Sequence, residues 1–266
     1  MSNDISCWLP KIKILRQNLA DLEPVWLWKA EGNGCAPIYI FGTIHRINFN
    51  PDEIFGEAIK NTIEKVDTIF TEIEISNNCV NKRSIDCWVA ALARVQHKKL
   101  MPLENTEIRL SLGVSPSVLS DNIYANINAD DIKKISEEYL SGKIVAKSSL
   151  GGEADTLAAI ASRNIYWLLC SILDQSRNQK SCLVTVGCGH NVGELGLPNL
   201  LRGFGYILYP LIRKIPLTSH KTLRAMIHES TIFTSTSFFA KPVADKAKDE
   251  EQKSPSTEIV RFVPKH

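Results

Sequence analysis

Apolar runs alternate with amphipathic stretches along this chain, and the pattern predicts strands separated by helices. Strand-like runs occupy 25–29, 37–43, 68–75, 98–103, 182–187 and 205–212, and helical periodicity marks 50–65, 80–97, 155–173 and 197–203. Strands that alternate with helices favour an α/β sheet with helices on its faces. Because the first two predicted strands form a hairpin-like pair and a helical insert covers 105–142, we expect a mixed rather than an all-parallel sheet.

Local signals support several of these elements. Asn50 stands directly before a proline and two acidic residues, which is an arrangement that caps and begins a helix. The strand at 68–75 alternates so that Glu72 and Glu74 share one face. On the helix at 80–97, the spacing predicts one buried apolar face made of Trp88, Leu92 and Val95.

Composition divides the chain into four parts. A main domain is predicted over 25–212, preceded by a helical extension over 1–24. A C-terminal extension follows over 213–239, and 240–266 is rich in charged residues, Ser and Pro, which predicts a disordered tail. Inside the main domain, the Ser-, Gly- and Lys-rich stretch 141–152 is a candidate lid loop.

Charge and hydropathy argue against two classes of protein, those that bind nucleic acids and those that span a membrane. Of 266 residues, 31 are Lys or Arg and 29 are Asp or Glu, a balance that argues against dedicated nucleic-acid binding. No apolar run reaches the ~18 residues of a transmembrane segment, and the N-terminus lacks the pattern of a signal peptide. The sequence therefore predicts a cytoplasmic protein that acts on a peptide or a small molecule. Secretion directed by the charged tail is the alternative.

Cysteine usage points to the same compartment. The chain has 7 cysteines, an odd number, and they form no C-x-x-C pair. Cys87 and Cys170 lie in apolar runs, where a reduced and buried thiol is expected. The pattern predicts a reducing environment.

Two copies of a Gly-x-x-His pattern are the most informative chemical feature. Gly42 to His45 ends the second predicted strand, and Gly187 to His190 ends the fifth. The glycine permits a tight backbone path, and imidazole is both an acid–base group that titrates near neutrality and a common metal ligand. Two such strands in one sheet would aim His45 and His190 at one site.

Three further residues are candidates for that site. Glu72 is a carboxylate within an apolar strand, so it is either a metal ligand or general base, or a residue on a solvated sheet edge. Glu74 lies about 7 Å farther along the same face and could orient Glu72. Arg163 interrupts the apolar stripe of the helix at 155–173. It marks either a buried ion pair or anion-docking position, or a side chain that reaches solvent at the margin of the stripe.

The ordered set of motifs resembles the TraB/GumN family, which includes PrgY and the TIKI proteins. The similar segments are Trp28-Lys29, Tyr39 to His45, Asp67 to Glu74, Leu103 to Glu107, Arg163-Asn164 and Val186 to Tyr206. The resemblance covers about 25–212. It implies an α/β fold with α+β-like character: a mixed sheet flanked by helices with a helical insert, related in architecture to haem-binding ChaN-like proteins and erythromycin esterases.

The resemblance also implies a site. Some TIKI proteins are metal-dependent proteases whose active site combines both Gly-x-x-His motifs with the strand glutamate. Carried over, His45, Glu72 and His190 would bind one divalent ion, zinc, manganese or cobalt, with one position open for water. Glu74 would act as general base and Arg163 would stabilise the oxyanion. The protein would then be a hydrolase of the metallopeptidase class.

Two alternatives stand beside the metallopeptidase. In the first, one histidine activates water without a metal, as the resemblance to erythromycin esterases allows. In the second, the protein binds a peptide or haem and regulates without catalysis, as the resemblance to PrgY and ChaN-like proteins allows.

Overall fold

The computed structural model describes residues 25–75, 84–112, 128–142 and 153–212. The predicted extensions 1–24 and 213–239, the charged tail 240–266 and most of the candidate lid loop lie outside these ranges.

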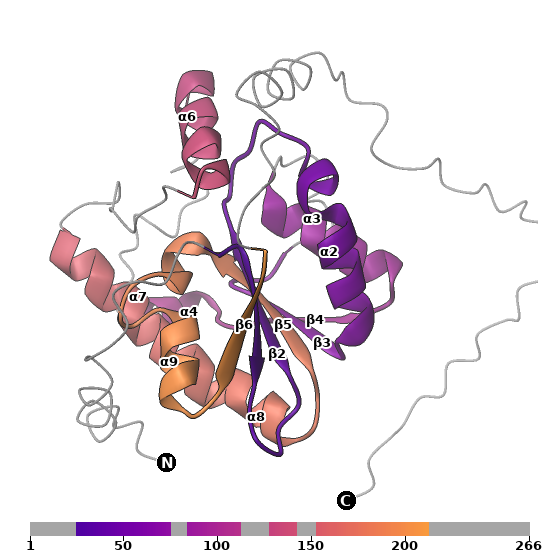
Figure 1. Ribbon diagram of the computed structural model, residues 1–266. Coiled ribbons are helices and arrows are strands. Elements are labelled where there is room, and N and C mark those ends of the chain that lie inside the picture. Colours follow the sequence, from indigo (N-terminus) through magenta and orange to yellow (C-terminus); the bar gives the residue numbers. More distant parts are fainter. Residues whose placement is uncertain (1–24, 76–83, 113–127, 143–152, 213–266) are drawn as a thin grey trace, which may run out of the picture. The chain divides into compact units, whose positions relative to one another are not determined.

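A six-stranded mixed sheet forms the centre of the domain (Figure 1). Its strands are β1 (Leu27–Glu31), β2 (Ile38–Thr43), β3 (Thr68–Thr71), β4 (Lys99–Pro102), β5 (Cys182–Gly187) and β6 (Ile207–Ile212), in the order β4-β3-β5-β2-β1-β6. Strands β2, β5, β3 and β4 are parallel, and β1 is antiparallel to both β2 and β6. The predicted mixed α/β sheet is confirmed.

The parallel strands end at a common edge of the sheet. Thr43 pairs with Gly187, and Thr71 pairs with Thr185. Ligand and catalytic groups of α/β sheets gather beyond the carboxyl ends of parallel strands. The segments that follow β2, β3, β4 and β5 therefore meet at one edge although they are far apart in the chain.

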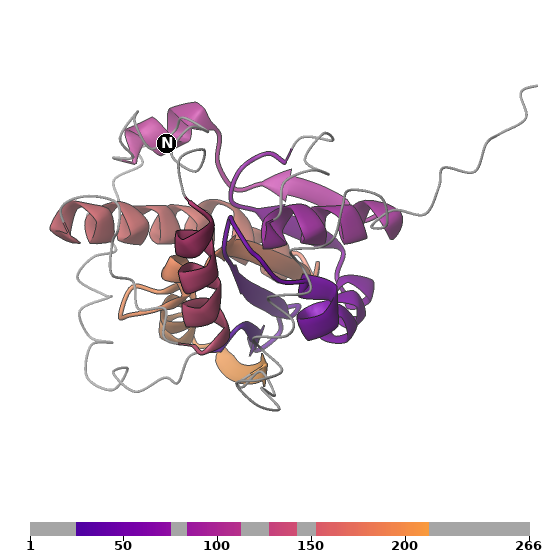
Figure 2. The ribbon, with the colours of Figure 1, turned by 90° about the horizontal axis from the view of Figure 1, so that it is seen from above.

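Helices cover both faces of the sheet (Figures 1 and 2). One face packs against α2 (Pro51–Lys65), α3 (Ile85–Val95) and the buried end of α6 (Ala129–Leu140). The other face packs against α7 (Glu153–Trp167), α8 (Leu173–Arg177) and α9 (Leu197–Gly203). A π-helical turn, Leu168–Ile172, joins α7 to α8, and a short helix, α4 (Thr106–Ser111), follows β4.

Aromatic packing fixes the end of β2 beside the first helical layer. Tyr139 of α6 donates a hydrogen bond to the carbonyl of Gly42 at 2.6 Å, and Trp26 donates to the carbonyl of Tyr139 at 3.1 Å. Phe55 of α2 contacts both Phe41 and Tyr139 edge-on. The backbone that leads into the first Gly-x-x-His motif is thus held by three buried rings.

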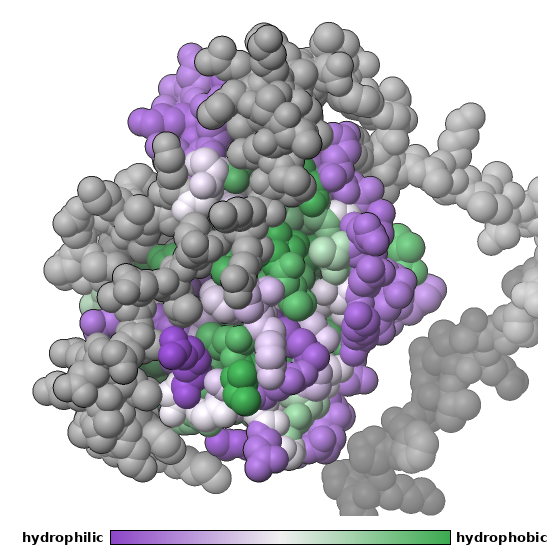
Figure 3. All heavy atoms as spheres, in the orientation of Figure 1, coloured by the Kyte–Doolittle hydropathy of each residue, from purple (hydrophilic) through white to green (hydrophobic). Residues whose placement is uncertain are grey.

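Polar positions fall where the helices face solvent. Asn50 accepts a hydrogen bond from the Asp52 N–H at 3.1 Å, so the predicted cap of α2 is confirmed. Hydrophilic side chains gather over the outer sides of α2 and α6 (Figure 3). Within the described ranges, no helix is long and apolar enough to cross a bilayer.

Three local predictions were wrong. Strand β3 ends at Thr71, because the chain bends there and the Thr71 hydroxyl donates to the carbonyl of Ile73 at 2.8 Å. Val95 at the end of α3 is 76% exposed, whereas Trp88 and Leu92 pack against the core as predicted, beside the buried Ile85, Val89, Ala90 and Ala93. Of the two thiols expected to be reduced and buried, Cys87 is disulfide-bonded, and Cys170 is free as predicted but exposed.

Candidate functional site

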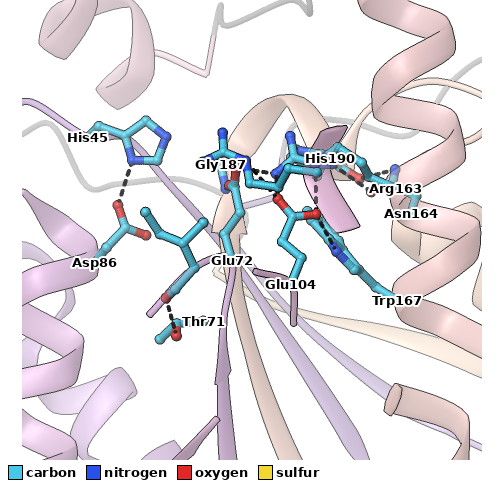
Figure 4. A network of polar contacts seen from close by, with 12 residues as sticks. His45, Thr71, Glu72, Asp86, Glu104, Arg163, Asn164, Trp167, Gly187 and His190 are labelled. Carbon is cyan, nitrogen blue, oxygen red and sulfur yellow. Dashed lines mark hydrogen bonds and ion pairs between the residues drawn. The ribbon is translucent and has the colours of Figure 1, made fainter. Parts of the chain in front are cut away.

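The strand-end residues converge on a space beside Gly187 (Figure 4). A Cβ placed on Gly187 would lie 3.5 Å from Oε2 of Glu72, 3.9 Å from Nε2 of His45 and 3.9 Å from Cδ2 of His190. The two histidines and the glutamate predicted to share a site therefore surround one point. Among the residues that the structure describes, none places a side-chain atom within 3.4 Å of this point, because position 187 is glycine.

Arg163 links the glutamate to the second histidine. Its Nη2 donates to Oε1 of Glu72 at 2.5 Å, and its Nη1 lies 3.2 Å from Nε2 of His190. The same guanidinium donates to both carboxylate oxygens of Glu104, at 3.1 Å from Nε and 2.5 Å from Nη2. All four side chains are buried, so this is an internal ion-pair network and not a surface one.

The hydrogen bonds of His190 determine its tautomer. The Asn164 amide donates both N–H groups to carbonyls, those of His190 and Leu195, so its Oδ1 accepts from Nδ1–H of His190 at 2.7 Å. Nε2 of His190 then carries a lone pair and accepts from Arg163. Burial, aided by Arg163 and opposed by Glu72, lowers the pKa of His190 to about 3, which keeps the ring neutral.

His45 has a different environment. Its Nδ1 lies 3.0 Å from Oδ2 of Asp86 at the start of α3, and Oδ1 of Asp86 accepts from the Thr43 hydroxyl at 2.6 Å. Burial opposes a charge on His45, but the hydrogen bond and attraction of Asp86 raise its pKa to about 9. Water reaches the side chain, which is 36% exposed, and moderates this rise. His45 is thus the solvent-facing, protonated member of the site.

Glu72 and Glu104 both contact the Arg163 guanidinium, but their pKa values shift in opposite directions. Burial opposes ionisation of Glu72, yet Arg163 and the nearby histidines outweigh it and hold its pKa well below the ordinary value. Gly187 N–H adds a hydrogen bond to Oε2 of Glu72 at 3.2 Å. For Glu104, burial dominates and raises the pKa in spite of Arg163.

The remaining predicted residue, Glu74, is exposed, unlike the buried members of this network. It follows the end of β3 in an exposed stretch, because the strand that would have aligned it with Glu72 stops at Thr71. Cys188, two residues before His190 in the chain, packs against the core, and burial raises the pKa of its thiol to about 12.

Asn164 and three other members of the site were not predicted as site residues from the sequence. Glu104 follows the end of β4 as Glu72 follows that of β3, so the rule that selected strand-end polar residues could have found it. Trp167 lies one turn after Arg163 on α7 and donates to Oε2 of Glu104 at 2.9 Å. Asp86 stands in the first turn of a helix, where an acidic residue is ordinary, and nothing in the sequence marks it as the partner of His45.

Arg163 occupies two of the ligand atoms predicted to bind a metal ion. Nε2 of His190 and Oε1 of Glu72 both face Arg163, so a divalent ion held by His45, Glu72 and His190 would require the guanidinium to withdraw. Within the described ranges, no group of three His, Cys, Asp or Glu side chains is placed to hold a metal ion. These residues therefore do not form a ready three-ligand set, and the metal stays a prediction.

Replacing Asp86 with asparagine is expected to lower the pKa of His45 from about 9 to 6.5 or below, because burial then acts without its main opposing charge. The raised pKa of the wild type stabilises the folded state fully below pH 6.5, and this contribution is lost as pH rises through about 9. NMR titration of the His45 ring protons, assigned with a His45→Ala variant, measures both values. An unchanged midpoint in Asp86→Asn would contradict the assigned partner.

Comparison with protein-family models, with curated proteins and with solved structures yields no match to this chain.

Proposed function

We propose that the chain is a hydrolase of the TraB/GumN type in which His45 and Glu72 act as an acid–base pair. The convergence of Nε2 of His45 and Oε2 of Glu72 on the space beside Gly187 carries the proposal. Environments that move two titratable groups in opposite directions suit them to acid and base roles. At neutral pH, His45 holds a proton to donate and Glu72 has a carboxylate oxygen to accept one.

The site supports one sequence of steps. Water attacks the carbonyl carbon of an ester or amide, and Glu72 accepts the water proton as the new C–O bond forms. The tetrahedral intermediate then collapses, and His45 donates its Nε2 proton to the leaving group as the scissile bond breaks. Asp86 keeps the ring oriented through Nδ1. Exchange with solvent then removes the proton from Glu72 and returns one to His45.

The hydrogen-bond count of Arg163 supports its predicted role in stabilising the oxyanion. Its contacts with Glu104, Glu72 and His190 use four of the five guanidinium N–H groups, which leaves one on Nη1. A preorganised donor in a buried site stabilises developing negative charge far better than one in water. The remaining N–H is the group that would face the oxyanion.

The test is hydrolysis of a panel of chromogenic esters and peptides by the purified full chain, with and without chelator. We expect turnover that survives chelation and is lost in His45→Ala and in Glu72→Gln. The matched controls are His97→Asn, at an exposed left-handed position that asparagine tolerates, and Glu57→Gln on the exposed side of α2. Both controls should keep wild-type rates.

Other outcomes select the alternatives. Turnover that disappears on chelation and returns with zinc, manganese or cobalt would replace this mechanism with the metallopeptidase. Absence of turnover under all conditions, together with peptide or haem binding by the wild type, would overturn the hydrolase in favour of a binding protein.

A further inference from the structure

We propose that Glu104 is the positioning residue of this site, because it holds the Arg163 guanidinium in the single orientation that serves both Glu72 and His190. The catalytic consequence rests on the proposed function. The structural assignment does not, since it concerns only how one buried side chain is held.

The contacts of Glu104 define the plane of the guanidinium. Its two oxygens accept from Nε and Nη2 of Arg163, a fork that fixes rotation about the end of the arginine side chain. Trp167 donates to the same carboxylate at 2.9 Å, and its ring lies under Arg163 with the guanidinium carbon 4.8 Å from the ring centroid. Glu104 and Trp167 thus constrain the guanidinium from its edge and from its face.

Only this orientation satisfies the two remaining partners. With Nε and one Nη2 hydrogen directed to Glu104, the second Nη2 hydrogen reaches Oε1 of Glu72, and Nη1 reaches Nε2 of His190. Loss of the fork would leave the guanidinium free to turn toward Glu72 alone. His190 would then lose the donor to its lone pair.

The backbone places Glu104 for this role. Leu103 N–H donates to the carbonyl of Thr71 at 2.8 Å, so the residues before Glu104 and Glu72 are joined across the ends of β4 and β3. Arg109 of α4 approaches Oε1 of Glu104 from outside, with its Nε at 3.2 Å. The Glu104 side chain has 0% exposure, so it has no access to substrate and acts through Arg163.

Glu104→Gln tests the assignment, because an amide offers one oxygen and can accept from only one arm of the fork. We expect the Arg163 Nε–H to exchange with solvent at least about tenfold faster. The ¹⁵N resonance of Nε2 of His190 should move toward that of an unbonded lone pair, while its Nδ1–H signal persists. Glu107→Gln removes the same charge from an exposed position of α4 and should leave both signals unchanged.

Glu104→Asp provides a second variant should Glu104→Gln fail to fold, since it keeps the charge but is one methylene too short to reach both nitrogens. Where the hydrolase is active, kcat should fall by about 10- to 100-fold in either variant with little change in KM. Wild-type Arg163 exchange and His190 shifts in a folded variant would overturn the proposal. Spectral changes without any turnover in the wild type would overturn only the hydrolase.

Discussion

Replacing Arg163 with methionine is expected to lower the free energy of unfolding by about 3–5 kcal/mol at pH 7, the largest loss that any single substitution in this site should cause. The reason is that Glu72 and Glu104 would remain buried without the cation that both contact. Methionine fills much of the volume, so the loss reflects uncompensated charge more than a cavity. Urea denaturation measures it.

The free energy of unfolding of Arg163→Met should also depend on pH differently from that of the wild type. In the wild type, Glu72 has a folded pKa below its unfolded value, so its contribution is complete above about pH 4.5 and is lost as pH falls through the folded value. Without Arg163, burial raises both carboxyl pKa values above their unfolded ones. The variant should therefore gain stability as pH falls from 7 to 5, over a range in which Glu72 gives the wild type no such gain.

Arg177→Met is the matched control, because Arg177 is exposed at the end of α8. We expect it to change the free energy of unfolding by less than about 1 kcal/mol, with no new pH dependence. An equally small effect for Arg163→Met would mean that water, and not the guanidinium, neutralises the two carboxylates.

Replacing Gly187 with alanine is expected to abolish most activity while the fold is retained. A methyl group there would make ordinary van der Waals contact, 3.5 Å from Glu72 and 3.9 Å from both histidines, and the backbone at φ −49°, ψ 136° suits any residue. The free energy of unfolding should stay within about 0.5 kcal/mol of the wild type. The methyl would nevertheless occupy the point where substrate must meet His45 and Glu72, so kcat/KM should fall by about 100-fold or more.

Gly189→Ala controls for the added methyl group. Two residues farther along, the described residue nearest to a Cβ would be Ile160, whose side chain lies 3.9 Å away, and we expect both stability and kcat/KM to be retained. Hydrolysis assays and urea denaturation of the wild type, Gly187→Ala and Gly189→Ala measure kcat/KM and the free energy of unfolding. Full activity in Gly187→Ala would show that chemistry takes place elsewhere.

The sequence predicted the elements that depend on local pattern. Alternating apolar runs located the strands, and Asn50 located the start of α2, because capping and strand formation use neighbouring residues. The end of β3 was predicted wrongly, and so was the burial of Val95 on α3. Which side of a short helix is buried depends on the layer that packs against it, and that layer is not encoded within the helix.

The residues of the candidate site could likewise be predicted only where the signal lies in neighbouring residues. Because glycine and histidine at a strand end are visible in a single stretch of sequence, His45 and His190 could be selected in advance. Their partners are remote: Asp86 lies 41 positions from His45, and Arg163 lies 59 positions from Glu104. Only the strand order β4-β3-β5-β2 and the packing of α3 and α7 against the sheet bring these side chains into contact.

The sequence alone therefore determined which residue types stand at the carboxyl ends of the strands, since that information is local and periodic. The tertiary structure decided what those side chains face. It directs Nε2 of His190 and a carboxylate oxygen of Glu72 toward Arg163, and places Nε2 of His45 beside Gly187. Burial then separates the two histidines into a neutral ring and a protonated one, because a desolvated charge persists only where a partner such as Asp86 compensates it.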